Sequence, residues 1–166
     1  MAHLDLDSLL KISPRFKAAT DSADMYMTVL QNQLYGMQVE YQRKLNEYDS
    51  LQKTWSPLIK ALKEKEIRDL ENNIQAFQQQ AQDDYTTYRA QLYEPVFKEI
   101  DDAIKAVALA HGYKYVIDST KGNGLLYSAP TDDIFDEVRV KLGIPVPAKP
   151  KPAPAPGGAP TPPGGH

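Results

Sequence analysis

The side chains best suited to chemistry in this 166-residue chain form an acidic group near its C-terminal end. Asp132, Asp133, Asp136 and Glu137 supply carboxylate oxygens, the ligands that a divalent cation such as Ca²⁺ prefers. The same acids stand at the expected start of a helix, where free N–H groups and the helix dipole favour negative charge. We therefore interpret them as helix-start residues and expect no metal site.

Histidine and glycine offer no stronger candidate for catalysis. We expect His111 to be the only histidine inside the fold, which leaves it no partner for a His-based metal site or an acid–base pair. Gly122 and Gly124 are too loosely spaced for a phosphate-binding loop, and the patterns GxxxxGK[ST] and GxSxG are absent. These two glycines are typical of a turn. The sequence thus predicts no enzyme and no cofactor.

Composition and charge narrow the function classes further. Apolar residues make up 42% of the chain and charged residues 25%, values typical of a globular protein. The net charge of −3 comes from interspersed acids and bases, without the basic surface that nucleic-acid binding requires. No apolar run approaches the length of a membrane span, and the pattern of a signal peptide is missing. We expect no nucleic-acid partner and no transmembrane segment.

Two long helices are predicted to dominate the fold. Ser13 and Pro14 are typical of a helix start, where the serine caps free N–H groups and the proline takes the first helical position. Beyond them, apolar and aromatic residues recur at steps of three and four over residues 30–62 and again over residues 67–107. Each stretch therefore predicts a helix with one apolar stripe along its length.

The ends of these helices are predicted as well. A Ser-Pro pair at positions 56–57 repeats the start pattern, so we expect the chain to reverse between about residues 55 and 64. Pro95 falls inside the second stripe and is expected to kink that helix. His111 and Gly112 are typical of its end, because glycine readily adopts the left-handed conformation that closes a helix. The result is a long antiparallel hairpin.

The rest of the chain is predicted to form a small β body. Alternating apolar and charged side chains over residues 3–10 predict a short half-buried strand. Residues 113–130, YKYVIDSTKGNGLLYSAP, predict two further strands joined by a glycine turn. A short amphipathic helix follows over residues 130–145, with Gly143 near its end. The predicted fold class is therefore α+β and mostly α, with three strands per chain.

Three segments follow from this pattern. We expect residues 3–13 and 112–144 to form the β body, residues 14–111 the helical arm, and residues 145–166 a disordered Pro- and Gly-rich tail. Such a small body is marginal by itself and leaves sheet edges open, so we expect it to be completed by other copies in a closed oligomer. The strand residues expected to take part are Leu4, Leu6, Tyr115, Val116, Ile117, Leu125, Leu126 and Tyr127.

Several motifs carry a family resemblance. GYKYVID over residues 112–118, LLY over residues 125–127 and DDIFDEVRVKLG over residues 132–143 resemble motifs of the Skp family of periplasmic chaperones, also called OmpH-like. The Gln-rich arm sequence KEKEIRDLENNIQAFQQQAQ is a weaker match. The order of elements is similar to that of the family over about residues 3–143.

The resemblance implies more than the residue patterns give. It implies a homotrimer, in which strands of three chains complete a small β-barrel and three coiled-coil arms enclose a cavity. The implied partners are unfolded outer-membrane or other envelope proteins, held in the periplasm. The family's last helix usually begins Asp-Ile-Thr, whereas Phe135 follows Ile134 here, so we expect its cap to be Asp133 or Asp136.

Aromatic residues of the arm are the candidate binding residues. Those on the stripes are expected mainly to pack between the helices. Tyr26, Tyr35, Tyr93 and Phe97 lie partly off the stripes, and we expect them to give an ATP-independent holdase many weak contacts with an unfolded client. The alternative is a scaffolding protein whose coiled-coil arm binds one folded partner, with the Pro-rich tail as a spacer. Binding of denatured clients would favour the holdase.

Overall fold

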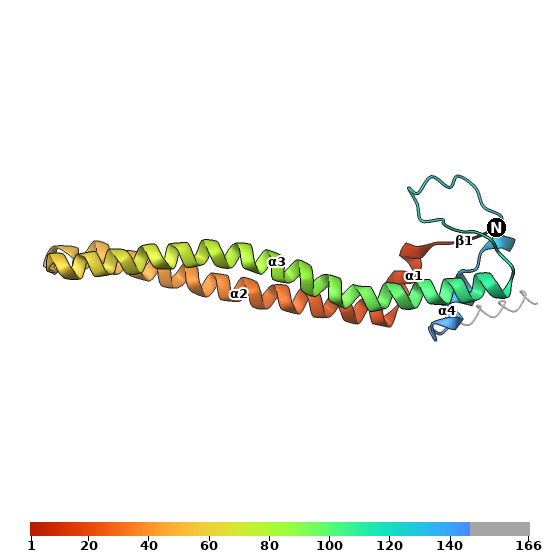
Figure 1. The fold of residues 1–166 in the computed structure, drawn as a ribbon, viewed down its shortest axis with the longest axis horizontal. Helices are drawn as coiled ribbons and strands as arrows, with labels where there is room; N and C mark the ends of the chain where they lie inside the picture. Colours follow the sequence, from red (N-terminus) through yellow and green to blue (C-terminus); the bar gives the residue numbers. More distant parts are fainter. Residues whose placement is uncertain (147–166) are drawn as a thin grey trace, which may run out of the picture.

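Two long antiparallel helices make up most of the molecule (Figure 1). The computed structural model describes residues 1–146, in which α2 (Pro14–Leu51) and α3 (Pro57–Ala110) project as an arm from a small body. This arrangement confirms the predicted mostly helical α+β class with a long helical hairpin. The short C-terminal helix is confirmed as α4 (Phe135–Lys141). The tail predicted over residues 145–166 lies outside the described residues from position 147 onward.

Both helix starts of the arm follow the predicted Ser-Pro pattern. Ser13 Oγ accepts a hydrogen bond of 3.3 Å from the N–H of Phe16, and Ser56 Oγ accepts one of 3.4 Å from the N–H of Ile59. The reversal lies slightly before the predicted window, because α2 ends at Leu51 and a short 3₁₀ turn, η1 (Gln52–Thr54), precedes the second cap.

The second arm helix is unusually long and contains an internal proline. At 1.5 Å per residue, its 54 residues span about 80 Å. It continues through Pro95, which has no N–H to donate to the carbonyl of Gln91. It ends as predicted, with His111 as the cap residue and Gly112 at a φ of 69°.

The body contains two strands rather than the three predicted. β1 (Ala2–Leu4) pairs in parallel with β2 (Val116–Asp118), with His3 opposite Ile117. His3 also bridges to Asp133, at the start of the segment that leads into α4. A short 3₁₀ turn, η2 (Pro130–Asp132), comes before that bridge.

The predicted strand over residues 3–10 ends early and gives way to the helix α1 (Leu6–Ile12). Asp5 caps this helix, since its carboxylate accepts hydrogen bonds from the backbone N–H and the hydroxyl of Ser8 at 2.9 and 2.8 Å. Leu6, Leu9 and Leu10 also stand at steps of three and four, which place them on one face of a helix. The alternation over Leu4–Asp7 was therefore too short to specify a strand.

The predicted hairpin over residues 113–130 is also not formed in the single chain. Its first strand is present as β2, but its partner is β1, and residues 119–129 form a loop. Gly122 and Gly124 turn this loop with φ of 101° and 82°, as turn glycines do. The segment predicted as the second strand, Leu125–Tyr127, has no strand partner within residues 1–146.

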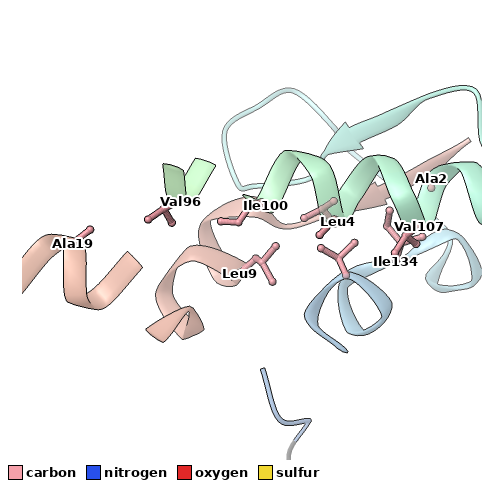
Figure 2. Close-up of a cluster of buried hydrophobic side chains, with 10 residues drawn as sticks. Ala2, Leu4, Leu9, Ala19, Val96, Ile100, Val107 and Ile134 are labelled. Carbon is pink, nitrogen blue, oxygen red and sulfur yellow. The ribbon is translucent and has the colours of Figure 1, made fainter. Parts of the chain in front are cut away.

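The hydrophobic core lies where the base of the arm meets the body (Figure 2). Leu9 of α1, the α4 cap residue Ile134 and Val138 of α4 are at most 1% exposed. Ile100 and Val107 of α3 belong to the same cluster, so the base of this long helix forms one wall of the core. The body and the arm are thus held together by a shared apolar interior.

The arm itself is packed much more thinly. Beyond Leu30 of α2 and before Val96 of α3, the structure contains no fully buried side chain. The stripe residues there are half-buried between the two helices, as a pair of helices without further neighbours requires. Side chains off this stripe face solvent along the whole arm.

Candidate functional site

An aromatic cluster lies on the arm close to the body. The ring centroid of Phe16 lies 5.2 Å from that of Tyr93 and 6.3 Å from that of Phe97, and the last two are 6.1 Å apart. The Arg89 guanidinium lies 5.4 Å from the Tyr93 ring, within cation–π range. We call Phe16, Arg89, Tyr93 and Phe97 the base cluster. Phe97 is 44% exposed, which leaves much of its ring free for contact.

Helical spacing explains how α3 builds this cluster. Arg89, Tyr93 and Phe97 follow one another at steps of four and therefore lie on one face. Tyr93 is half-buried, and its hydroxyl lies 3.0 Å from Thr20 Oγ1 on α2, which fixes the ring between the helices. An open groove of about 440 Å³ follows the same face from Tyr85 to Phe97.

A second aromatic pair lies farther along the arm. The rings of Tyr26 and Tyr88 have centroids 4.5 Å apart and are tilted by 48°, so each tyrosine is half-buried by the other. An open groove of about 490 Å³ adjoins the pair. Its rim includes Met25 and Val29, which are 71% and 58% exposed. This region offers apolar surface that the arm itself does not use.

The four aromatic residues predicted to bind clients therefore occupy different environments. Tyr93 and Phe97 are brought together in the base cluster, and Tyr26 lies in the separate pair with Tyr88. Tyr35 stands alone on α2 and is 68% exposed. The structure thus distributes these rings along the arm and does not gather them into one pocket.

The eight predicted strand residues are also divided. Leu4 is buried in β1, Val116 and Ile117 are half-buried in β2, and Leu6 lies in α1. The other four, Tyr115, Leu125, Leu126 and Tyr127, lie outside any strand of the described chain.

The loop after β2 exposes an unusual amount of apolar surface. In this loop Leu126 is 99% exposed and Tyr127 81%, and Tyr115, just before β2, is 69% exposed. A hollow of about 260 Å³ is lined in part by Met1, Ile117 and Tyr127. Isolated exposed apolar residues are common, but adjacent ones beside a strand edge are typical of an interaction site.

The acidic side chains over residues 132–137 and the two histidines of the body mainly make contacts at helix ends and at the sheet. Asp133 Oδ1 accepts a hydrogen bond of 2.9 Å from the N–H of Phe135, the first residue of α4, but the cap position itself is Ile134, so the expected cap at Asp133 or Asp136 was wrong. Glu137 Oε2 lies 2.5 Å from His111 Nε2, which connects α4 to the end of α3. Within residues 1–146, no three potential ligand side chains are grouped closely enough to hold a metal ion.

The expectation that His111 is the only histidine inside the fold was wrong. His3 lies in β1 and is half-buried, and its Nε2 lies 3.1 Å from the carbonyl oxygen of Ala129. The predicted strand over residues 3–10 already contained His3, and β1 places it opposite Ile117 of β2. His3 thus fastens the loop before η2 to the sheet.

A network of carboxylates joins the end of β2 to the start of α1. Asp118 Oδ1 accepts hydrogen bonds from the N–H groups of Leu6 and Thr120 at 3.2 and 2.9 Å and from the Thr120 hydroxyl at 2.6 Å. The Thr120 hydroxyl also lies 3.1 Å from Asp5 Oδ1, and the Asn123 side-chain amide donates to Asp118 Oδ2 at 2.6 Å. We call Asp5, Asp118 and Thr120 the carboxylate joint.

The hydrogen bonds of the carboxylate joint govern its titration. Partial burial acts to raise the pKa of Asp118, but the hydrogen bonds from Thr120 and Leu6 together outweigh it and lower the pKa. The pKa of Asp5 is lowered first by the backbone N–H of Ser8 and then by the Ser8 hydroxyl. Both carboxylates are therefore held in the charged form by the fold.

Sequence reasoning missed two members of the base cluster, Phe16 and Arg89. Phe16 follows the helix start and precedes the recognised stripe, yet it stands at steps of three and four from Ala19 and Thr20, a spacing that would have revealed it. Arg89 carries no such pattern, because only the fold places its guanidinium over the Tyr93 ring.

Comparison with known proteins agrees with this geometry. The family model described as outer membrane protein (OmpH-like) matches residues 1–142. A crystal structure from Caulobacter crescentus CB15, described as an OmpH-like outer membrane chaperone, superposes with a TM-score of 0.75. That similarity covers 85% of this chain and 82% of the other at 16% sequence identity, so it concerns the fold. No curated protein matches the chain in sequence. Within residues 1–146, no helix combines the length and hydropathy that crossing a bilayer requires.

Proposed function

The chain belongs to the OmpH-like family of outer membrane proteins, and on that premise we propose that it is an ATP-independent holdase chaperone. The clients would be unfolded outer-membrane or other envelope proteins, captured in the periplasm before they aggregate. The observation that carries the proposal is the apolar and aromatic surface left open along the arm, at Met25, Val29, Tyr35 and Phe97.

Dispersed contacts of this kind suit an unfolded client. Each exposed side chain contributes only a weak apolar contact, but a long flexible polypeptide touches several at once and stays captured by high effective concentration. Weak contacts also exchange quickly, so the client is not locked into one conformation. The proposed capture needs no cofactor and no catalytic group, because burial of apolar surface drives it.

We further propose that three copies assemble through the β body, so that three arms enclose a cavity. Support comes from the exposed residues Leu126 and Tyr127, which lie in the loop after β2, and from the two-stranded sheet, which is marginal by itself. Pairing of this segment with a neighbouring copy would supply the third strand. In this proposal residues 3–13 and 112–144 form the assembly body and residues 14–111 form the arm.

The decisive experiment measures protection of a denatured β-barrel protein against aggregation by light scattering. We expect the wild-type chain to suppress scattering and the variant Tyr35→Ser/Phe97→Ser to require a several-fold higher concentration, because those two rings are the exposed members of the predicted set. Tyr26 and Tyr93 are left intact, since both pack between the helices.

Val140→Ser is the matched control. It removes a 63% exposed apolar side chain from α4 of the body and should leave protection unchanged. Equal protection by the wild type and the double variant would refute the role of Tyr35 and Phe97. A wild-type chain that ignores the denatured protein and binds one folded partner stoichiometrically would favour the scaffolding alternative.

A further inference from the structure

The loop after β2 contains an asparagine followed directly by a glycine. Asn123 and Gly124 form the only such pair in the 166-residue sequence. The loop projects from the body (Figure 1), and both residues are exposed and lie outside any helix or strand. Such a pair is typical of a tight turn. The same two residues also carry groups that react with each other, a backbone nitrogen and a side-chain amide.

The backbone nitrogen of Gly124 is unhindered. Gly124 has no side chain, and apart from its chain neighbours no atom of residues 1–146 lies within 4 Å of the place that a Cβ would occupy. Its N–H donates no hydrogen bond to any group in this part of the chain. The nitrogen is therefore free to approach the carbonyl carbon Cγ of the preceding Asn123, a close approach that a larger residue would obstruct.

The four other asparagines provide a comparison within the same chain. Asn32 and Asn46 lie in α2, and Asn72 and Asn73 lie in α3. In a helix the N–H of the following residue donates to the carbonyl four positions before it, so that nitrogen is held away from the asparagine side chain. Each of the four is also followed by a residue with a side chain. Asn72 and Asn73 are exposed, so exposure alone does not distinguish Asn123 from them.

We propose that Asn123 is a self-modification site, which converts to aspartate or isoaspartate through attack by the Gly124 nitrogen. The nitrogen forms a bond to Cγ and gives up its proton, and the side-chain NH₂ group leaves as ammonia. This step produces a five-membered succinimide ring. Water then opens the ring, at Cγ to give aspartate or at the backbone carbonyl carbon to give isoaspartate. The net reaction consumes one water, releases one ammonia and requires no oxidant.

The reaction alters the carboxylate joint defined above. The Asn123 side-chain amide donates a 2.6 Å hydrogen bond to Asp118 Oδ2. In the product a carboxylate replaces this donor, and a carboxylate can only accept hydrogen bonds. Two carboxylates so close together repel, which opposes the ionised form of Asp118.

The modification should therefore loosen the body. Asp118 Oδ1 also accepts hydrogen bonds from the N–H groups of Leu6 and Thr120, so a displaced or protonated Asp118 weakens the connection between β2 and the start of α1. Isoaspartate disturbs the loop further, because it adds one atom to the main chain. This effect goes beyond the proposed holdase, since it involves neither a client nor the arm.

Mass spectrometry of the aged full chain tests the site. After weeks in mildly alkaline buffer, which favours loss of the Gly124 N–H proton, trypsin should release residues 122–139 with Asn123 as their only asparagine. This peptide should gain about 1 Da, the difference between NH and O, and should separate into an aspartate and an isoaspartate form. Conversion at Asn123 should be at least about tenfold faster than at any helix asparagine.

Two variants test the effect on the carboxylate joint. Asn123→Gln keeps a side-chain amide but would have to close a six-membered ring, which forms much more slowly, so its mass and its urea midpoint should stay constant on ageing. The wild-type midpoint should fall as the converted fraction grows. Asn123→Asp should show a lowered midpoint without any ageing.

Two outcomes would overturn the proposal. Conversion at Asn123 no faster than at Asn72 and Asn73 would make the pair a turn and nothing more. Conversion without any fall in the urea midpoint, in the aged wild type and in Asn123→Asp alike, would refute the effect on Asp118. Neither measurement involves a client, so both are independent of the holdase proposal.

Discussion

At the scale of single residues, Asp118 does more for the fold than its position at a strand end suggests. Its carboxylate connects β2 to the backbone of Leu6 and to Thr120, so one side chain ties the sheet to the start of α1. Hydrogen bonds to a charged acceptor are stronger than those to a neutral one. Asp118 therefore helps position the segment in which the exposed Leu126 and Tyr127 lie.

This role predicts an acid-sensitive stability. Because the fold lowers the pKa of Asp118 below its ordinary value of 3.8, the ionised form stabilises the fold above that pH. The stabilisation is lost as the pH falls through the lowered value. Asp118→Asn should reduce the free energy of unfolding by about 1–2 kcal/mol at neutral pH and weaken its decline in acid. Urea denaturation over a range of pH measures both effects.

Asp24→Asn is the control for this experiment. Asp24 is exposed on α2, and no residue in the described part of the chain hydrogen-bonds to its carboxylate. The control should leave the free energy of unfolding unchanged within about 0.5 kcal/mol. Identical acid dependence in Asp118→Asn and in the wild type would contradict the assigned role.

At the scale of elements, the two long helices and α4 were predictable from sequence, whereas α1 and the strand pairing were not. Ser-Pro pairs and apolar steps of three and four are local signals, and both caps and the long arm follow from them. Strand pairing depends on distant residues, and nothing in the sequence shows that Ala2 faces Val116. A segment of four alternating residues such as Leu4–Asp7 fits a strand and a capped helix equally well.

The same limit applied to the candidate site. The apolar stripes indicated which aromatic residues lie off them, but the exposed fraction of each side chain also depends on its neighbours on the opposite helix. Tyr26 and Tyr93 are half-buried because Tyr88 and Phe16 lie against them, whereas no aromatic ring of residues 1–146 packs against Tyr35. The sequence alone therefore suggested the four aromatic candidates but did not show which of them are most exposed.

The two helix prolines of α3 provide a test within one element. Pro57 stands at the first helical position, where its missing N–H has no consequence, whereas Pro95 interrupts a helix interior. Pro95→Ala should raise the free energy of unfolding by about 1–2 kcal/mol, after allowance for the greater freedom of the unfolded chain. Pro57→Ala should leave the free energy of unfolding unchanged. Thermal unfolding followed by circular dichroism compares the two variants, and equal effects would contradict the different roles assigned to the two prolines.

At the scale of the whole molecule, assembly should depend on the loop after β2. Leu126→Ser/Tyr127→Ser removes two side chains that are 99% and 81% exposed in the single chain. If they become buried between copies, as proposed, the double variant should dissociate at a concentration at least about tenfold higher than the wild type does. Sedimentation equilibrium or light scattering measures the mass.

Leu58→Ser/Ile59→Ser serves as the control for assembly, because it removes comparable apolar surface from the tip of the arm. It should leave the mass of the assembly unchanged. A wild-type chain that sediments as a folded monomer at micromolar concentration would refute the proposed trimer and the enclosed cavity with it.

The thin packing of the arm has a mechanical consequence. Local opening of a structure requires less free energy where few side chains are fully buried. Between Leu30 and Val96 the arm has none, while its base is anchored in the core. The arm should therefore be flexible toward its far end and rigid at its base. In the proposed chaperone, this flexibility would let the arms adapt to clients of different size.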